Sequence, residues 1–245
     1  MKVAISQPTY LPWLGYFDLM DQVDVFVLLD DVQFEKQSWQ QRNRIKTPQG
    51  LQWLTVPVAF RGRLEQKIKD VEIRVPDFWR YHLRAVELNY RRAHFFANYY
   101  EDLSVILGSS GVLLAELNAR LIEWLAKSLG LRTKVLRSSE LQQEGKRTEL
   151  LANICTRLGA TEYRSPIGSS EYLLKEIEML TGRGIEVRFQ NYVHPEYPQL
   201  FPPFAPYACI LDLLFNVGPE GMAVIRSGRG EALNWRLVME MVRVR

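Results

Sequence analysis

Three residues of the sequence carry groups suited to acid–base chemistry. Asp30 and Asp31 directly follow the apolar run at 25–29, and His194 lies in a polar, aromatic stretch at 191–199. A carboxylate or an imidazole beside a substrate can accept the proton of an attacking amine or hydroxyl. We therefore predict that His194, Asp30 and Asp31 are catalytic, while a turn, a strand cap or a loop hydrogen bond to backbone is the alternative role for each.

A second group of residues has the charge and spacing to bind an anion. Arg42, Arg44 and Lys46 alternate with other residues along a predicted strand, which places three cations on one face. Ser165 and Ser169 lie just before a predicted helix, whose first backbone N–H groups attract phosphate or carboxylate. A solvated hairpin face and ordinary helix capping are the alternative interpretations. The chain contains neither a P-loop nor a G-x-G-x-x-G motif, so neither of those phosphate-binding loops is predicted.

The remaining predicted substrate-binding residues are aromatic and amide side chains. Aromatic rings can stack on a base or a sugar, and amides can hydrogen-bond to hydroxyl groups. These residues are Gln7, Tyr10, Trp13, Tyr16, Gln33, Asn43, Tyr197 and Gln199. Several of them follow a predicted strand, and in open α/β sheets ligands bind beyond the carboxyl ends of the strands. We therefore expect them to converge on one edge of a sheet.

Apolar periodicity predicts the elements that must position these side chains. A pattern of helix, glycine and strand occurs three times, with helices at 112–129, 147–158 and 170–180 and strands at 132–137, 161–164 and 185–189. Two further strands, at 3–6 and 25–29, are separated by a predicted helix at 14–22. This alternation predicts an α/β fold, a three-layer Rossmann-like sandwich with a mostly parallel sheet.

A β-rich insertion and a helical segment interrupt the alternation. Two β-like runs, at 39–46 and 51–58, flank Thr47-Pro48-Gln49-Gly50, which predicts a β-hairpin insertion near residues 38–75, with a further strand predicted at 72–75. Residues 76–110 form a predicted helical segment that begins at Pro76. Because no low-complexity linker separates these parts, we expect one α/β domain over residues 1–245.

Composition excludes several kinds of protein. With 47% hydrophobic residues and a net charge of +3, the chain is neither typical of disorder nor basic enough to favour nucleic acid. It has no apolar run of roughly 18 residues, so no membrane span is expected, and because the first eight residues lack the apolar core of a signal peptide we expect a strand there. Cys155 and Cys209 lack metal-ligand spacing, which argues against a zinc site and a disulfide. We expect a cytoplasmic protein whose partner is a small molecule, and the sequence carries no signal for an oligomeric state.

The N-terminal motif resembles the opening of the WbqC-like proteins. The likeness begins with the run from Gln7 to Phe17 and continues through residues 24–34, 42–46, 158–165, 194–199 and 210–216. One departure is Ala208-Cys209-Ile210, where the family suggests a Leu-Ser-Ile type of run. The resemblance implies a transferase of bacterial surface-polysaccharide biosynthesis, which moves a glycyl or acyl group to or from an activated sugar or amino sugar. Its substrate would be a sugar, a nucleotide-sugar or an acyl donor.

Two alternative functions remain open. The segment Trp13-Leu14-Gly15-Tyr16 after the first strand is similar to the [HT]-x-G-H site of nucleotidylyltransferases, with Trp13 and Tyr16 in place of both histidines. That likeness implies a nucleotide-binding protein, and Mg²⁺ is expected as a cofactor only if a nucleotide is bound; no metal ligands are predicted. A non-enzymatic scaffold of a biosynthetic complex is the other alternative, and it would expose a large apolar patch in place of a pocket.

Overall fold

A six-stranded sheet forms the centre of the protein. The computed structural model describes residues 1–63, 65–109 and 111–243. The strand order is β5-β2-β1-β6-β7-β8, with the first five parallel and β8 antiparallel to β7. The strands are β1 (Lys2–Ser6), β2 (Val25–Leu28), β5 (Lys134–Arg137), β6 (Glu162–Ser165), β7 (Glu186–Phe189) and β8 (Leu233–Asn234). The predicted α/β fold with a mostly parallel sheet is therefore confirmed, and β8 is an addition that the sequence pattern did not predict.

Helices connect the parallel strands, as the helix, glycine, strand pattern predicted. The connecting helices are α1 (Leu14–Asp21), α4 (Leu114–Ser128), α6 (Thr148–Leu158) and the broken helical run α7 (Ser170–Leu173), η3 (Leu174–Glu176) and α8 (Glu178–Thr181). The predicted helix at 170–180 is thus three short pieces. Gly130 and Gly159 follow α4 and α6 with φ of +73° and +68°, a left-handed conformation that glycine adopts without a steric penalty. The chain ends in α9 (Ile210–Val217), α10 (Gly221–Ser227) and α11 (Trp235–Arg243).

Both faces of the sheet are covered. Along β1, Val3 and Ile5 belong to a core shared with α6 and α8, whereas Ala4 belongs to a second core shared with α1, α4 and α9. Successive strand residues point to opposite faces, so an uninterrupted apolar strand can serve two cores at once. The central strands therefore lie between two helical layers, which is the arrangement of a Rossmann-like sandwich.

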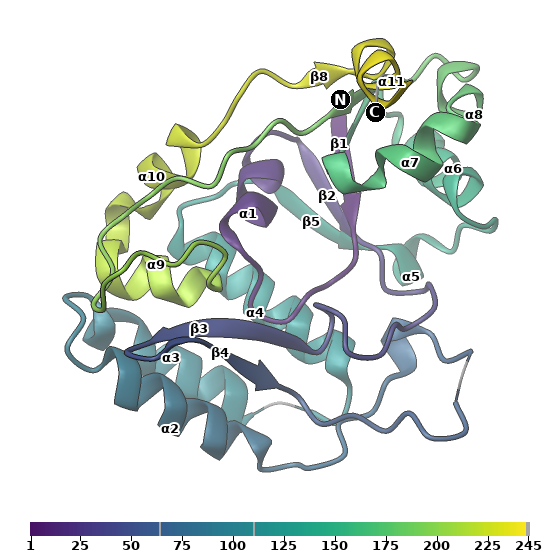
Figure 1. The fold of residues 1–245 in the computed structure, drawn as a ribbon. Helices are drawn as coiled ribbons and strands as arrows, with labels where there is room; N and C mark the ends of the chain where they lie inside the picture. Colours follow the sequence, from purple (N-terminus) through teal and green to yellow (C-terminus); the bar gives the residue numbers. More distant parts are fainter. Residues whose placement is uncertain (64, 110, 244–245) are drawn as a thin grey trace.

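The predicted β-hairpin is a separate two-stranded sheet. It consists of β3 (Arg42–Thr47) and β4 (Gly50–Thr55), and β3 begins after Trp39 instead of including it. The strand predicted at 72–75 forms only isolated bridges, and the helical segment is divided into α2 (Phe78–Tyr90) and α3 (Phe96–Gly108). In Figure 1 the hairpin lies beneath the end of β1, with α2 and α3 below it.

The strand order identifies the place where a ligand is expected. The chain passes from β1 outward through β2 to β5 and then returns to β6 on the other side of β1. At such a switch point the connections leave in opposite directions, and this opens a crevice beyond the carboxyl ends of the two strands. Ser6 and Ser165 are the last residues of β1 and β6, so the crevice begins there. Among the described residues, no helix combines the length and apolar character needed to cross a membrane.

Candidate functional site

The first of two adjoining chambers lies between β1, the start of α1 and the hairpin. We call it the aromatic chamber, and its volume of about 540 Å³ is within the usual range of small-molecule sites. It is lined by Ser6, Thr9, Trp13, Gly15, Tyr16, Leu19, Trp39, Asn43, Arg44, Pro166, Gln190 and Tyr207. Aromatic rings make up much of this wall, and Arg44 is the one charged side chain among these lining residues.

The second chamber lies beyond β6 and is richer in hydroxyl groups. We call it the hydroxyl chamber, and its volume is about 510 Å³. It is lined by Ile5, Ser6, Gln7, Thr9, Leu29, Glu35, Ser38, Trp39, Gln40, Leu151, Tyr163, Ser165, Pro166, Gly168, Ser169 and Tyr172. Ser6, Thr9, Trp39 and Pro166 line both chambers. The two chambers therefore meet at the switch point between β1 and β6.

The side chain of Trp13 can lie over the first turn of α1 because residue 15 is a glycine. The indole lies over Gly15, and a Cβ at position 15 would come within 2.3 Å of the ring. The ring of Trp13 also lies 5.6 Å from that of Tyr192, 5.8 Å from that of Tyr207 and 6.4 Å from that of His194, between centroids. This cluster joins the loop that follows β7 to the start of α1 and forms one wall of the aromatic chamber.

Arg44 reaches the aromatic chamber from β3, among two partly exposed tryptophans. Its guanidinium carbon lies 5.3 Å from the ring centroid of Trp53 and 5.6 Å from that of Trp39. Arg42 lies 4.3 Å over Trp53, outside the residues that line the chamber. The Nε donors of Arg42 and Arg44 are buried and have no hydrogen-bond partner in the described part of the chain. Unpaired donors beside a cavity favour an anionic ligand.

The third cation of this predicted stripe has a different environment. Lys46 is 3% exposed, and its ammonium donates to the Pro203 carbonyl at 2.8 Å. Asn43, on the opposite face of β3, lines the aromatic chamber and also donates to the Leu11 carbonyl at 2.7 Å. Arg44 therefore lines the aromatic chamber and Arg42 lies over Trp53 outside its lining, while Lys46 is buried where the hairpin meets the chain before α9.

Tyr197 and Gln199 lie in a buried network around Asp212. The carboxylate accepts hydrogen bonds from the hydroxyls of Tyr197 at 2.8 Å and Tyr90 at 2.9 Å, and from the Gln199 amide at 2.7 Å. Burial raises the pKa of Asp212, although these hydrogen bonds oppose the shift. The network fixes the loop before α9, and none of its members is among the residues lining either chamber.

Asp30 and Asp31 are placed beside the next strand, β5. Asp30 is 2% exposed and accepts hydrogen bonds from the backbone N–H of Ser139 at 2.9 Å and from its hydroxyl at 2.8 Å. Asp31 accepts a hydrogen bond from the Ser138 hydroxyl. Ser138 and Ser139 begin the short helix α5 (Ser138–Leu141), so both carboxylates bond to its N-terminal end. Neither aspartate is among the residues lining either chamber.

His194 lies behind the aromatic wall, with both ring nitrogens engaged. Its Nδ1 lies 2.9 Å from the Pro195 carbonyl, and its Nε2 accepts the backbone N–H of Tyr207 at 3.1 Å. Burial lowers the pKa of the imidazole, which favours this neutral form. For His194 to act as a base, the hydrogen bond from the backbone N–H of Tyr207 to its Nε2 would have to break. In the structure this hydrogen bond holds the backbone of Tyr207, which has a left-handed conformation with φ of +62°.

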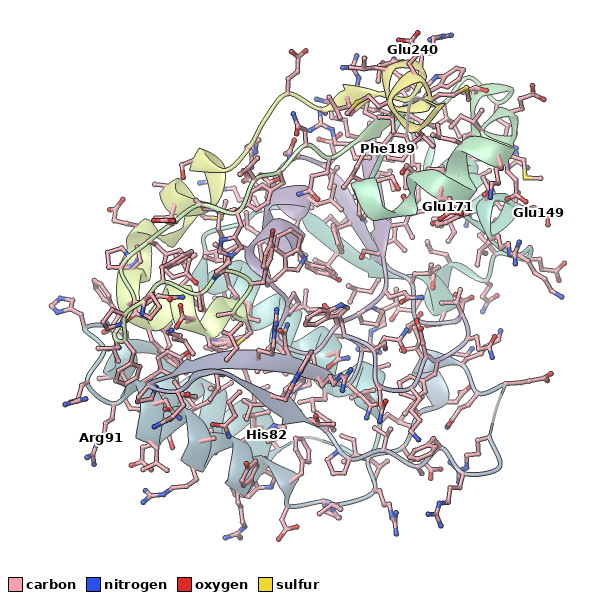
Figure 2. All side chains as sticks on the ribbon, viewed as in Figure 1. His82, Arg91, Glu149, Glu171, Phe189 and Glu240 are labelled. Atoms are coloured by element: carbon pink, nitrogen blue, oxygen red, sulfur yellow. The ribbon has the colours of Figure 1, made fainter. Side chains whose placement is uncertain are left out.

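The remaining predicted residues divide between the chambers and the core. Tyr16 lines the aromatic chamber, and Gln7, Ser165 and Ser169 line the hydroxyl chamber. Tyr10 is fully buried, and its hydroxyl lies 2.8 Å from Nδ1 of His82, whose place between α2 and the hairpin is visible in Figure 2. Gln33 is exposed, forms an isolated β-bridge with Lys67 and is not among the residues lining either chamber.

Five polar or aromatic residues that line the aromatic chamber were not among the predicted site residues: Ser6, Thr9, Trp39, Gln190 and Tyr207. Gln190 directly follows β7, a position that could have been included, whereas Tyr207 is remote from any strand end. The amide of Gln190 donates to the Gly15 carbonyl at 2.8 Å and to Asp18 at 2.7 Å. Asp18 is completely buried and pairs with Arg229 at 2.7 Å, so a buried ion pair supports the wall of the aromatic chamber.

No metal site is formed by side chains of the described residues. Within residues 1–63, 65–109 and 111–243, no group of three or more histidines, cysteines, aspartates or glutamates is arranged to hold a metal ion. Both cysteines are buried, and burial raises the pKa of each thiol to about 12. Neither thiol is therefore prepared for nucleophilic chemistry at neutral pH.

The fold and the cleft define a class of protein first. It is an α/β protein with a Rossmann-like sheet and a ligand-sized cleft at the switch point of the strands. Sequence comparison then identifies the family: the model of the WbqC-like protein family matches residues 7–224, and the chain belongs to that family. The chain is 42% identical over 230 residues to the uncharacterised protein Rv1507c of Mycobacterium tuberculosis, a match that covers 93% of this chain and 99% of that protein. No solved structure matches the chain.

Proposed function

We propose that this protein is a cytoplasmic transferase that binds an activated sugar or amino sugar in the aromatic chamber and takes part in glycyl or acyl transfer during surface-polysaccharide synthesis. One observation carries the proposal. Among the residues that line this chamber, the single charged group is Arg44, and it is accompanied by Trp13, Tyr16, Trp39 and Tyr207. A nucleotide-activated sugar has an anionic diphosphate for the guanidinium and flat rings for the aromatic wall.

The proposed reaction requires two reactants held side by side. The nitrogen or oxygen of the acceptor forms a bond to the acyl carbon, while the bond from that carbon to its activating group breaks. The activating group leaves with the electron pair, and the acceptor proton passes to a base. Holding both reactants at the strand ends supplies much of the acceleration, because it removes the entropic cost of their encounter. His194, Asp30 and Asp31 stay the predicted base candidates, each needing release from its present hydrogen bonds.

A binding panel on the intact protein tests this proposal. The panel contains a UDP-sugar, acyl-CoAs, free amino acids and nucleoside triphosphates, each with and without Mg²⁺. We expect the UDP-sugar to raise the unfolding temperature and Arg44→Gln to weaken its binding by about tenfold or more, because charge-assisted hydrogen bonds contribute about 1.5–3 kcal/mol. The matched control is Arg80→Gln, since Arg80 also lies over a tryptophan, Trp79, at 4.9 Å, but outside both chambers.

The outcomes of this panel separate the candidate functions. Stabilisation only by a nucleoside triphosphate with Mg²⁺ would replace the transferase proposal with nucleotidylyl chemistry. Equal losses in Arg44→Gln and Arg80→Gln would show that the guanidinium in the aromatic chamber has no special part in recognition. If no compound in the panel stabilised the protein, the scaffold alternative would be favoured.

A further inference from the structure

The two chambers have opposite charge. Among the residues lining the hydroxyl chamber, Glu35 is the one charged side chain, and no lysine, arginine or histidine lines it. Among those lining the aromatic chamber, Arg44 is the one charged side chain, and no carboxylate lines it. An anionic group entering the hydroxyl chamber would lose hydration without meeting a cation, which is unfavourable. The chambers are therefore suited to ligands of different charge.

The wall of the hydroxyl chamber is suited to a molecule with several hydroxyl groups. Ser169 is the partly exposed end of a chain of hydroxyls that runs through the buried Ser165 to the buried Tyr163, with Ser165 3.4 Å from the Tyr163 hydroxyl. Further partly exposed hydroxyls that line the chamber are those of Ser6, Thr9 and Ser38. Hydroxyl groups both donate and accept, so such a wall can match a polyol in more than one orientation. Trp39 adds a flat surface, 48% exposed, against which the apolar face of a sugar ring can pack.

Glu35 gives this chamber a preference for a positively charged group. The backbone N–H of Glu35 donates a hydrogen bond to Oε1 of Gln40 at 3.1 Å, which fixes the main chain at this residue. Glu35 lies on the exposed side of the chamber, and no salt bridge to a described residue neutralises its carboxylate. An ammonium group on a bound ligand could therefore pair with it.

We propose that the hydroxyl chamber is a second binding site, for a small hydroxylated molecule that carries an amine and no negative charge. The shared residues Ser6, Thr9, Trp39 and Pro166 would place its ligand beside that of the aromatic chamber, and this inference goes beyond the proposed function. Its binding does not depend on that function. The two ligands are expected to bind together and not to exclude each other.

Titrations of the intact protein with three simple sugars test the proposal. The probes are D-glucosamine, D-glucose and D-glucuronate, followed by ligand-observed NMR and by tryptophan fluorescence. We expect D-glucosamine to bind at least threefold more tightly than D-glucuronate. Glu35→Gln should weaken D-glucosamine by about threefold, the size of a solvent-exposed ion pair, and leave D-glucose unchanged.

Two further variants make the test specific. Glu171→Gln is the matched control, because Glu171, labelled in Figure 2, is an exposed carboxylate on α7 that pairs with Lys175 and is not among the residues lining either chamber. Arg44→Gln should leave D-glucosamine binding unchanged, since Arg44 lines the other chamber alone. Glu35→Gln should in turn leave the affinity for a UDP-sugar unchanged.

Each outcome decides one of the two proposals. D-glucuronate binding as tightly as D-glucosamine, competition between D-glucosamine and a UDP-sugar, or equal effects of Glu35→Gln and Glu171→Gln would each overturn the second site. Failure of the UDP-sugar to bind counts against the proposed function alone. D-glucosamine binding that depends on Glu35 would still support the second site in that case.

Discussion

The substitution Gly15→Ala tests how the aromatic chamber is built. In the structure a Cβ at position 15 would lie 2.3 Å from Cη2 and 2.4 Å from Cζ2 of Trp13. Optimal separations between carbon atoms are about 3.5–4.0 Å, so the indole must move by more than about 1 Å. The movement would separate Trp13 from the rings of Tyr207 and His194.

Two opposing effects set the magnitude. Replacing glycine by alanine inside a helix stabilises the fold by roughly 0.5–1 kcal/mol. Forcing a ring out of a packed position costs about 1–3 kcal/mol. We therefore expect a net loss of about 1 kcal/mol, which lowers the unfolding temperature of a chain of this size by about 2–4 °C.

A double-mutant cycle with Trp13→Ala isolates this effect. Urea unfolding of the wild type, the two single variants and the double variant gives the coupling between the two positions. Gly15→Ala should destabilise the wild type but stabilise the Trp13→Ala protein, where no ring obstructs the methyl group. Gly168→Ala is the matched control, because a Cβ there meets no atom within 4 Å. Additive free energies within about 0.3 kcal/mol would refute the reasoning.

Three further predictions concern buried or catalytic groups. If His194 or Asp30 is the general base, His194→Ala or Asp30→Asn should lower turnover by about 100-fold with unchanged far-UV circular dichroism, and near-normal turnover in both would remove them from the mechanism. Burial lowers the pKa of His82 from 6.5 to about 4, so the unfolded state binds more protons between those values. Stability should accordingly fall by about 3 kcal/mol as the pH is lowered from 7 to 4, and urea titrations should show a smaller fall in His82→Gln; equal falls would contradict this cause. Asp212→Ala should destabilise the protein by about 3 kcal/mol or more, because it removes the acceptor of three hydrogen bonds, two of them from the buried hydroxyls of Tyr90 and Tyr197, and a loss below 1 kcal/mol in urea unfolding would argue against the network.

The sheet could be predicted because its signals are local. Val25 to Leu29 is apolar at every position, as a strand covered on both faces must be, and Gly130 and Gly159 mark helix ends through their backbone conformation. The two-residue strand β8 was not predictable, since Leu233 and Asn234 become a strand only by pairing with β7. The helix at 170–180 was predicted as continuous because periodicity reports an apolar face and not the hydrogen-bond pattern within it.

The site was predicted less completely than the sheet, for a physical reason. Position after a strand pointed to Gln7, Ser165 and the Trp13 segment, which line one or the other chamber, because the carboxyl ends of parallel strands meet at one edge. Residue type could not separate Tyr16, which lines a chamber, from Tyr10, whose hydroxyl is held by His82 in the core. Both side chains are buried, and only the tertiary structure decides which of the two borders a chamber.

The pairing of β1 with β6 has a consequence for how the cleft assembles. Val3 lies opposite Tyr163, so the switch point joins segments about 160 residues apart, as the register shows. Such non-local pairing is slow and comes late in folding, whereas the hairpin, which pairs Thr47 with Gly50, is local and fast. During synthesis neither chamber can exist until β6 has left the ribosome and docked against β1. A ligand can therefore bind only after the sheet is complete. A bound ligand is expected to stabilise the pairing of the central strands as well as the loops around the chambers.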